Sequence, residues 1–202
     1  MNEKNQSVVL PIDGENSSGN GDILNEEDRC DILNFHLPRW EELPNLDLYM
    51  DQVIAFVDGA IGDLFRKIDA PLLTKSMVNN YVKARIIEAP INKKYSKIAV
   101  ASAIVVCILK SNFSVEEIGT LIRLGMGLGP VPVTYDRFCD AIEEALREVF
   151  CGNISLQNNY EKGRENRYLM GNFALSFACK YYTQLSFLSH QKKEARHKDK
   201  TR

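Results

Sequence analysis

The sequence predicts a mainly α-helical protein with one small β-hairpin. Apolar side chains recur at three- and four-residue spacing in several long segments, which is the period of an amphipathic helix. Only residues 86–95, where a proline and two lysines lie between apolar ends, are too short for a helix and compatible with a hairpin. The chain has 202 residues, of which 45% are hydrophobic and 26% charged, so it is long enough to bury a core without disulfides or metals.

The chain opens on a polar segment. Residues 1–34 lack hydrophobic periodicity and are rich in acidic residues, Asn, Ser and Gly, so we expect a disordered acidic tail. Residues 35–45 combine prolines with Phe35, Leu37 and Trp40, which predicts an ordered arm that packs on the core.

Two helices are expected after the arm. Apolar side chains at helical spacing cover residues 46–69 and predict one long helix, in which Gly59 and Gly62 are the points where it would break. Thr74 supplies an N-cap hydroxyl for a second, short helix over residues 75–84.

Capping residues mark the next two helices. Ser96 begins a helix over residues 97–111 that is hydrophobic nearly all round, so it must be buried on more than one side. Ser114 and Glu117 form a capping box at the start of another helix. Three glycines and a proline within residues 125–130 end that helix.

Two further helices are expected in the last third of the chain. Residues 134–150 place apolar side chains at i, i+3, i+4 and i+7 and predict a clean amphipathic helix. A polar loop over 153–163 precedes a helix over 164–189 with two apolar stripes, which indicate two neighbours: a symmetry mate, or a third helix of the same chain. We expect residues 134–189 to form a dimerisation or effector region, followed by a disordered basic tail over 190–202.

The net charge of −2 hides a segregation of charge along the chain. Residues 1–70 carry 5 basic and 15 acidic side chains, whereas residues 71–112 carry 7 and 1. The alternation repeats with 3 and 7 over residues 113–160, and with 10 and 4 over residues 161–202. Most charge runs only solvate a surface, but clustered basic residues are also the footprint of a DNA-binding surface. Residues 71–112 are the only basic block that lies in predicted regular structure from end to end.

The outward face of the helix over residues 75–84 is suited to DNA. Its apolar side chains share the opposite face, which leaves a polar set pointing outward: Lys75, Ser76, Asn79, Asn80 and Lys83. Asparagine pairs bidentately with adenine edges, and lysine and serine bind guanine edges or phosphates. Lys93 and Lys94, beside Tyr95, lie in the hairpin where a wing would touch the flanking DNA backbone. The order of these elements predicts a DNA-binding winged helix-turn-helix over residues 35–125, while the plainer alternative is a solvated helix surface.

Two known families resemble this segment. The DNA-binding domain of MerR-type regulators is similar at Thr74-Lys-Ser-Met-Val-Asn-Asn-Tyr81, at Lys94-Tyr95-Ser96 and at Phe113-Ser-Val-Glu-Glu-Ile118. A closer resemblance, over roughly residues 36–125, is to the bacterial family domain of unknown function 1836, at Leu37-Pro-Arg-Trp-Glu-Glu-Leu-Pro44, Leu48-Tyr-Met-Asp-Gln-Val53 and Leu73–Lys83. Membership of that family implies a helical MerR-like fold but no established activity. Arg85 stands where MerR-type domains have a glycine, so it must take a left-handed backbone at some cost or avoid it.

The sequence carries no pattern typical of a catalytic or cofactor site. The histidines are His36, His190 and His197, which form no cluster with metal-binding or catalytic spacing. The five cysteines form no C-x-x-C pair and are odd in number, so we expect reduced thiols. The glycine-rich run over 125–130 follows no strand and precedes no P-loop lysine, which argues against a phosphate loop. We therefore expect no enzyme activity, no cofactor and no metal.

The same sequence bears on the location of the protein. The longest apolar run, residues 98–109, is shorter than the roughly 20 residues that a membrane-spanning helix requires. The first thirty residues lack the basic and apolar regions of a signal peptide. We therefore expect a cytoplasmic protein that binds no membrane.

Two functions from different classes remain. We hypothesise a dimeric, DNA-binding transcriptional regulator in which the helix over residues 75–84 enters the major groove. The alternative is a helical adaptor that has lost DNA binding and contacts protein through its acidic N-terminal region and the apolar stripes of its last helix. The basic block over residues 71–112 separates the two hypotheses. A DNA-binding protein keeps this block exposed and contiguous, whereas an adaptor covers it or pairs it with the acidic helix over 46–69.

Overall fold

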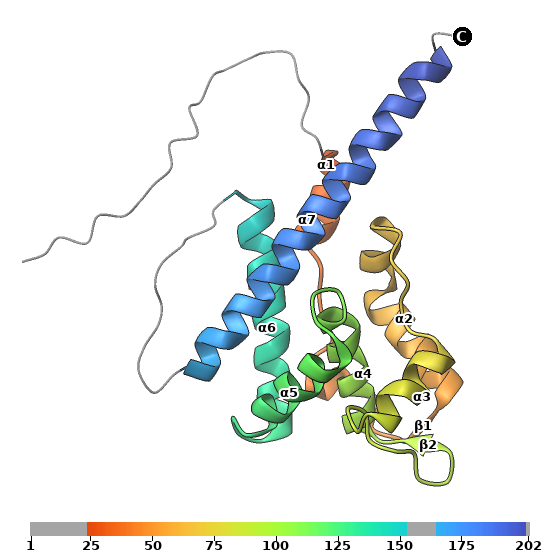
Figure 1. The fold of residues 1–202 in the computed structure, drawn as a ribbon, viewed down its shortest axis with the longest axis vertical. Coiled ribbons are helices and arrows are strands. Elements are labelled where there is room, and N and C mark those ends of the chain that lie inside the picture. The colour runs from red at the N-terminus through yellow and green to blue at the C-terminus, as the bar shows by residue number, and fades with distance from the viewer. Residues whose placement is uncertain (1–23, 153–164, 201–202) are drawn as a thin grey trace, which may run out of the picture.

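The protein folds mainly into helices and has one small β-sheet (Figure 1). The computed structural model describes residues 24–152 and 165–200. Its elements, in chain order, are α1 (Glu26–Leu33), η1 (Trp40–Glu42), β1 (Leu48–Tyr49), α2 (Met50–Lys67), α3 (Lys75–Lys83), β2 (Lys94–Tyr95), α4 (Lys97–Leu109), α5 (Val115–Met126), α6 (Val131–Phe150) and α7 (Glu165–Lys200). The predicted fold class, mainly α-helical with a small β wing, is confirmed.

Side-chain caps begin three of the helices at the predicted residues. The Thr74 hydroxyl accepts a hydrogen bond from the Met77 N–H at 3.2 Å and starts α3. The Ser96 hydroxyl caps α4 in the same way. Ser114 and Glu117 form the predicted capping box of α5, in which each side chain accepts from the other residue's backbone N–H.

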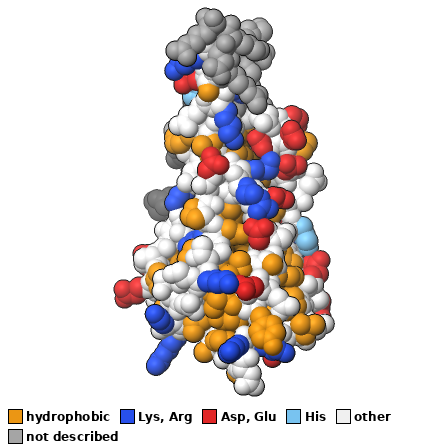
Figure 2. Space-filling model, turned by 90° about the vertical axis from the view of Figure 1, so that its right-hand side faces the viewer, with side chains coloured by type: hydrophobic (Ala, Val, Ile, Leu, Met, Phe, Trp, Pro, Cys, Tyr) orange, Lys and Arg blue, Asp and Glu red, His pale blue; other side chains and the backbone are white. Residues whose placement is uncertain are grey.

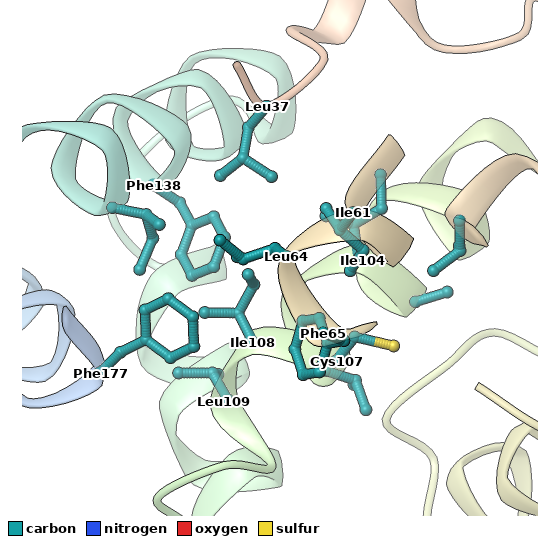
Figure 3. Close-up of a cluster of buried hydrophobic side chains, with 14 of the residues drawn as sticks. Leu37, Ile61, Leu64, Phe65, Ile104, Cys107, Ile108, Leu109, Phe138 and Phe177 are labelled. Atoms are coloured by element: carbon teal, nitrogen blue, oxygen red, sulfur yellow. The ribbon is translucent and has the colours of Figure 1, made fainter. Parts of the chain in front are cut away.

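Helix α4 is the central element of the core. Ten of its 13 residues are buried. Figure 3 shows Ile104 beside Ile61 of α2, and Ile108 on the side of Phe138 of α6 and Phe177 of α7. Because α4 leaves almost no face for solvent, helices from both halves of the chain must pack around it.

Helix α2 differs from the helix predicted over 46–69 in two respects. It begins only at Met50, because the two preceding residues form a strand. It also runs unbroken through Gly59 and Gly62. At Gly62 a Cβ atom would lie 2.6 Å from Nη1 of Arg66, so the glycine makes room for that side chain instead of ending the helix.

The predicted wing, which is the hairpin over residues 86–95, pairs with a strand that was not predicted from the sequence. Strands β1 and β2 are antiparallel, with Leu48 opposite Tyr95 and Tyr49 opposite Lys94. The two strands are more than forty residues apart in the chain, so the sheet joins the start of α2 to the start of α4. Long-range pairing of this kind leaves no local signal in strands of two residues.

A tight turn precedes β2. The backbone groups of Ile91 and Lys94 exchange two hydrogen bonds of 2.9 Å around Asn92 and Lys93. Both central residues have positive φ, 50° and 66°, as a primed hairpin turn requires. The hairpin predicted over 86–95 therefore turns through two residues, and its second strand, β2, pairs with β1.

The prediction of a disordered tail over residues 1–34 is wrong for its last part, where α1 forms. Ile32 of α1 is 3% exposed. Nη1 of Arg29 donates to the carbonyl of Phe150, at the end of α6, at 2.8 Å. These contacts come from residues far away in the chain, which explains why the local pattern did not indicate them. Residues 1–23 lie outside the described residues.

The C-terminal predictions also need correction. Helix α7 continues through residues 190–200, where a disordered tail was predicted. Helix α6 begins at Val131, directly after Pro130, and not at residue 134, because proline fits the N-terminus of a helix. The loop predicted over 153–163 lies outside the described residues.

Helix α7 finds its neighbours within its own chain. Figure 1 shows it crossing α6 over much of the length of that helix. The rings of Phe150 and Tyr182 meet edge to face with centroids 5.1 Å apart. The Tyr181 hydroxyl donates to the carbonyl of Leu64 in α2 at 2.9 Å. The apolar stripes of this helix had two interpretations, a symmetry mate or other helices of the same chain. Packing on helices of the same chain accounts for these contacts.

The arm predicted over 35–45 is attached to α6 by a partly buried ion pair. Nη1 and Nη2 of Arg39 donate to the two carboxylate oxygens of Glu143 at 2.6 and 2.9 Å. The Leu37 N–H donates to the same carboxylate at 2.8 Å, and the Leu37 side chain is fully buried. Glu143 is only 6% exposed, so its charge depends on these donors.

Arg85 closes α3 with a left-handed backbone, at φ 57°. Its N–H donates to the carbonyl of Val82, and the N–H of Ile86 donates to the carbonyl of Tyr81 at 2.9 Å. This pair of hydrogen bonds is the Schellman motif, in which the position of Arg85 is normally glycine. The structure thus takes the strained option of the two that the sequence left open.

We expect Arg85→Gly to raise the free energy of unfolding by about 1 kcal/mol, because glycine adopts positive φ without a steric cost. Urea denaturation followed by circular dichroism measures the change. Lys83→Gly, inside the last turn of the same helix, is the control and should lower the free energy of unfolding by up to about 1 kcal/mol. A loss of stability in Arg85→Gly would contradict the conclusion that the backbone of Arg85 is strained.

Burial raises the pKa of Glu143, but the hydrogen bonds from Arg39 and Leu37 outweigh burial and hold the pKa below its usual value. A depressed folded-state pKa stabilises the protein above the unfolded-state pKa, and this stabilisation is lost as the pH falls through the folded-state value. We therefore expect Glu143→Gln to lower the free energy of unfolding by about 3 kcal/mol at neutral pH and by much less in acid. Urea melts at both pH values test this, with the exposed Glu144→Gln as control. An equal loss at both pH values would contradict the role of the carboxylate charge.

Candidate nucleic-acid interface

Helix α3 has one buried face and one polar face. Val78 and Tyr81 are 1% and 6% exposed and hold the helix on the core. The side chains predicted to face outward are all exposed: Lys75, Ser76, Asn79, Asn80 and Lys83. Within the described part of the chain, the last four of these side chains have no hydrogen-bond or ion-pair partner, so their polar groups are available to another molecule.

Lys75 alone in this set has a partner. Its Nζ lies 2.6 Å from Oδ1 of Asp51, in the first turn of α2, and the two side chains are 64% and 72% exposed. An ion pair this exposed contributes about 0–1 kcal/mol, so a phosphate can compete for the lysine. Among the described residues, this is the only ion pair between the basic block and α2, although Nζ of Lys110 also lies over the ring of Phe65 in α2.

Lys93 and Lys94 both lie at the exposed wing. Lys93 occupies the second central position of the turn, which extends its side chain from the end of the hairpin. Nζ of Lys94 lies 5.3 Å from the ring centre of Tyr49, its cross-strand neighbour. Tyr49 is 51% exposed, so this cation is held in place on the surface while it remains accessible.

The assignment of Tyr95 to the DNA contact is wrong. Tyr95 is 3% exposed and lies opposite Leu48 in the sheet, so its side chain faces the core. Burial raises the pKa of its hydroxyl. Side chains alternate between the two faces of a strand, and Lys94 takes the outer face. Tyr95 therefore anchors the wing and does not contact a ligand on its surface.

Two more cations of the basic block serve the fold. Nζ of Lys97 donates to Oδ1 of Asn45 at 2.6 Å and lies over the ring of Trp40. Nζ of Lys110 donates to the carbonyls of Pro71 and Leu72, so it fastens the end of α4 to the segment before α3. Burial lowers the pKa of Lys110.

Four exposed cations therefore remain available at the end of the molecule that carries α3 and the wing (Figure 1). These are Lys83, Arg85, Lys93 and Lys94. Among the described residues, these four have no ion-pair partner. Sequence reasoning missed Arg85, since it considered only the cost of the backbone there; the signal was a cation at the αL position directly after the helix.

The same end of the molecule also exposes apolar side chains. Leu46, next to β1, is 66% exposed, and Ile91 in the hairpin is 78% exposed. Figure 2 views the side of the molecule that carries α2 and α3, and it shows hydrophobic side chains gathered in the lower half with Lys and Arg among them. This surface is therefore mixed, neither uniformly basic nor uniformly apolar.

Three further findings on the described residues concern metal ions, membranes and thiols. No three His, Cys, Asp or Glu side chains within them are grouped as a metal ion requires. No described helix combines the length and the apolar character needed to cross a bilayer. The cysteines are free, and burial raises the pKa of Cys107 and Cys139 to about 12, which makes both thiols poor nucleophiles.

Comparison with known proteins supports one part of the resemblance. Residues 38–128 match a family described as Domain of unknown function (DUF1836). The matched segment runs from the arm to the end of α5 and contains α3, the wing and α4. No curated protein and no solved structure matches the chain. The family description names no activity, so the inference of function rests on the geometry of the site.

Proposed function

We propose that the protein is a MerR-like transcriptional regulator that binds double-stranded DNA through α3 and the wing. The observation that carries the proposal is the set of exposed polar and cationic side chains at the end of the molecule where α3 and the wing lie, of which only Lys75 has an ion-pair partner among the described residues. Its members combine the amide groups that read base edges with the cations that bind phosphates.

Each part of this surface has a distinct task in the proposal. Asn79 and Asn80, in the middle of α3, read base edges in the major groove. Lys83 and Arg85, where α3 ends, bind phosphates at one border of the groove, and the wing lysines bind the backbone beside it. Two copies of the chain would place two α3 helices on two half-sites of a symmetric operator, which is why we propose a homodimer.

A specific observation favours a second candidate, a protein-binding adaptor. Leu46 and Ile91 expose apolar side chains at the same end of the molecule as these cations, and Asp51 pairs with Lys75. A partner protein with an apolar centre and an acidic rim would fit such a surface. The two candidates differ in their dependence on salt and on phosphate.

We expect the full chain to bind mixed-sequence duplex DNA with a logarithmic salt slope of several units, because each phosphate neutralised contributes about −0.9. Lys83→Glu/Lys93→Glu should lose most of the affinity and about two units of slope. Fluorescence anisotropy of labelled duplex across a salt series measures both. Arg123→Glu/Arg137→Glu makes the same change of charge on exposed residues of α5 and α6. If both double variants bind alike, or if the native chain does not bind at low salt, the proposal is wrong and the adaptor function takes its place.

Asp51→Asn should strengthen non-specific DNA binding about two- to fivefold, because it frees Lys75 and removes a negative charge beside α3. The stability of the fold should change by less than about 1 kcal/mol, since the pair is exposed. Anisotropy at one fixed low salt concentration measures the effect. Asp63→Asn breaks a similarly exposed ion pair, with Arg66, on the same helix and should leave the affinity unchanged. Equal effects of the two substitutions on the affinity would show that α3 does not contact the DNA.

A further inference from the structure

The outward face of α3 carries two neighbouring asparagines. Ser76 and Lys83 lie seven residues apart, close to the line that points away from the core, since about 3.6 residues make one helical turn. Asn79 and Asn80 lie between them, one on each side of this line, and both are exposed. We call these two residues the amide pair. Within the described residues neither side chain has a hydrogen-bond partner, so their donors and acceptors are available to a ligand.

The rest of the fold fixes how α3 presents the amide pair. Val78 and Tyr81 are 1% and 6% exposed, so the opposite face of the helix is held in the core. Thr74 caps the first turn, and the N–H of Ile86 donates to the carbonyl of Tyr81 at 2.9 Å, which closes the last turn. A helix held at both ends and along one face cannot rotate to exchange the side chains that it exposes. The amide pair is therefore preorganised for a ligand that lies across the outward face of α3.

The side chains on this face are short where the amide pair lies. The serine and the two asparagines extend one carbon beyond Cα before their polar groups, whereas the long Lys83 lies in the last turn. A short side chain reaches a group of the ligand only if the backbone of the helix also comes close to it. The major groove of B-DNA is about 12 Å wide and admits an α-helix in this way.

The cations near the amide pair make a different kind of contact. Lys83 and Arg85, at the end of α3, and the two wing lysines are exposed. Nζ of Lys75 lies 2.6 Å from Oδ1 of Asp51, and α3 contains no arginine. Cations bind phosphates whatever the base sequence, so they hold the helix on the duplex without selecting a site. The amide pair is left as the group on α3 that distinguishes one base from another.

The chemistry of an amide favours adenine. In the major groove adenine presents the N6 amino donor beside the N7 acceptor, and the carbonyl and amino groups of one asparagine match both. Guanine presents two acceptors, O6 and N7, which match the donors of arginine or lysine. The composition of this face, with two amides and no arginine, therefore fits adenine better than guanine.

We propose that the amide pair selects adenine, so that the DNA segment contacted by α3 contains two A·T base pairs. Oδ1 of each asparagine accepts a hydrogen bond from the N6 amino group, and Nδ2 donates to N7. This inference rests on the proposed function, because the amides reach base edges only if α3 enters the major groove. It adds the class of DNA sequence that the protein selects.

Selection from a library of random duplexes with the full chain tests the inference. The enriched duplexes should hold two A·T base pairs at fixed positions in each half-site. Replacing these adenines by 7-deazaadenine removes the N7 acceptor, keeps the base pair and should weaken binding about tenfold. Replacing guanines of the same duplex by 7-deazaguanine should leave the affinity within twofold. An unchanged affinity with 7-deazaadenine, or a larger loss with 7-deazaguanine, would overturn the inference.

Variants separate the selection of bases from the binding of phosphates. Asn79→Ala/Asn80→Ala should lose the preference for the enriched duplex over a scrambled one. It should keep the salt slope and, within twofold, the affinity for the scrambled duplex, because no charge is removed. Alanine favours a helix, and circular dichroism checks that the fold is kept. A double variant that keeps the preference would contradict the role of the amide pair.

Two further variants are controls for this experiment. Asn172→Ala changes an exposed asparagine of α7 and should leave the preference unchanged. Lys83→Gln/Lys93→Gln should weaken binding to both duplexes and lower the salt slope, while the preference for the enriched duplex remains. If the lysine variant loses the preference and the asparagine variant keeps it, a lysine selects the base and the inference is wrong.

The same measurements distinguish a failure of this inference from a failure of the proposed function. A native chain that binds duplex DNA with a salt slope of several units but enriches no A·T base pairs would overturn only the selection of adenine. A native chain that binds no duplex at low salt would overturn both.

Discussion

Helix α4 has no polar face, and this constraint organises the molecule. A helix that is apolar all round must be covered on every side, and here the cover comes from helices on both sides of it in the chain. α2 packs against one side, while α6 and α7 close the other (Figure 3). The buried residues consequently form one continuous cluster, from Leu24 to Leu185. The segment that matches the family therefore shares its core with the helices that follow it.

Charged contacts at the N-terminal end complete this core. The guanidinium of Arg39 and the carboxylate of Glu143 join the arm to α6, and Lys67 at the end of α2 pairs with Asp28 and Asp31 of α1. These pairs are partly buried, so removing one partner leaves a desolvated charge. The acidity of the N-terminal region thus has a structural use, because part of it neutralises cations on other helices.

The candidate interface and an apolar cavity lined by α4, α5, α6 and α7 lie in different parts of the fold. The interface is formed by α3 and the wing, which pack on α2, whereas the cavity lies between α4 and α7. Helix α4 connects the two, because it follows β2 directly and also forms a wall of the cavity.

The sequence by itself determined the features that depend on neighbouring residues. The caps at Thr74, Ser96 and Ser114, the burial of α4 and the polar face of α3 all follow from the spacing of side chains within one helix or one turn. These local features were enough to predict a mainly helical fold. They also predicted the site well, because seven of its eight predicted residues are exposed in the structure.

Only the tertiary structure decided the features that depend on distant residues. It paired β1 with β2, and this register turned Tyr95 inward and Lys94 outward. It docked α1 through Arg29, and it used Lys97 and Lys110 inside the fold. In each case the deciding partner lies tens of residues away, and the energy of such a contact depends on how the chain closes on itself, which no local pattern records.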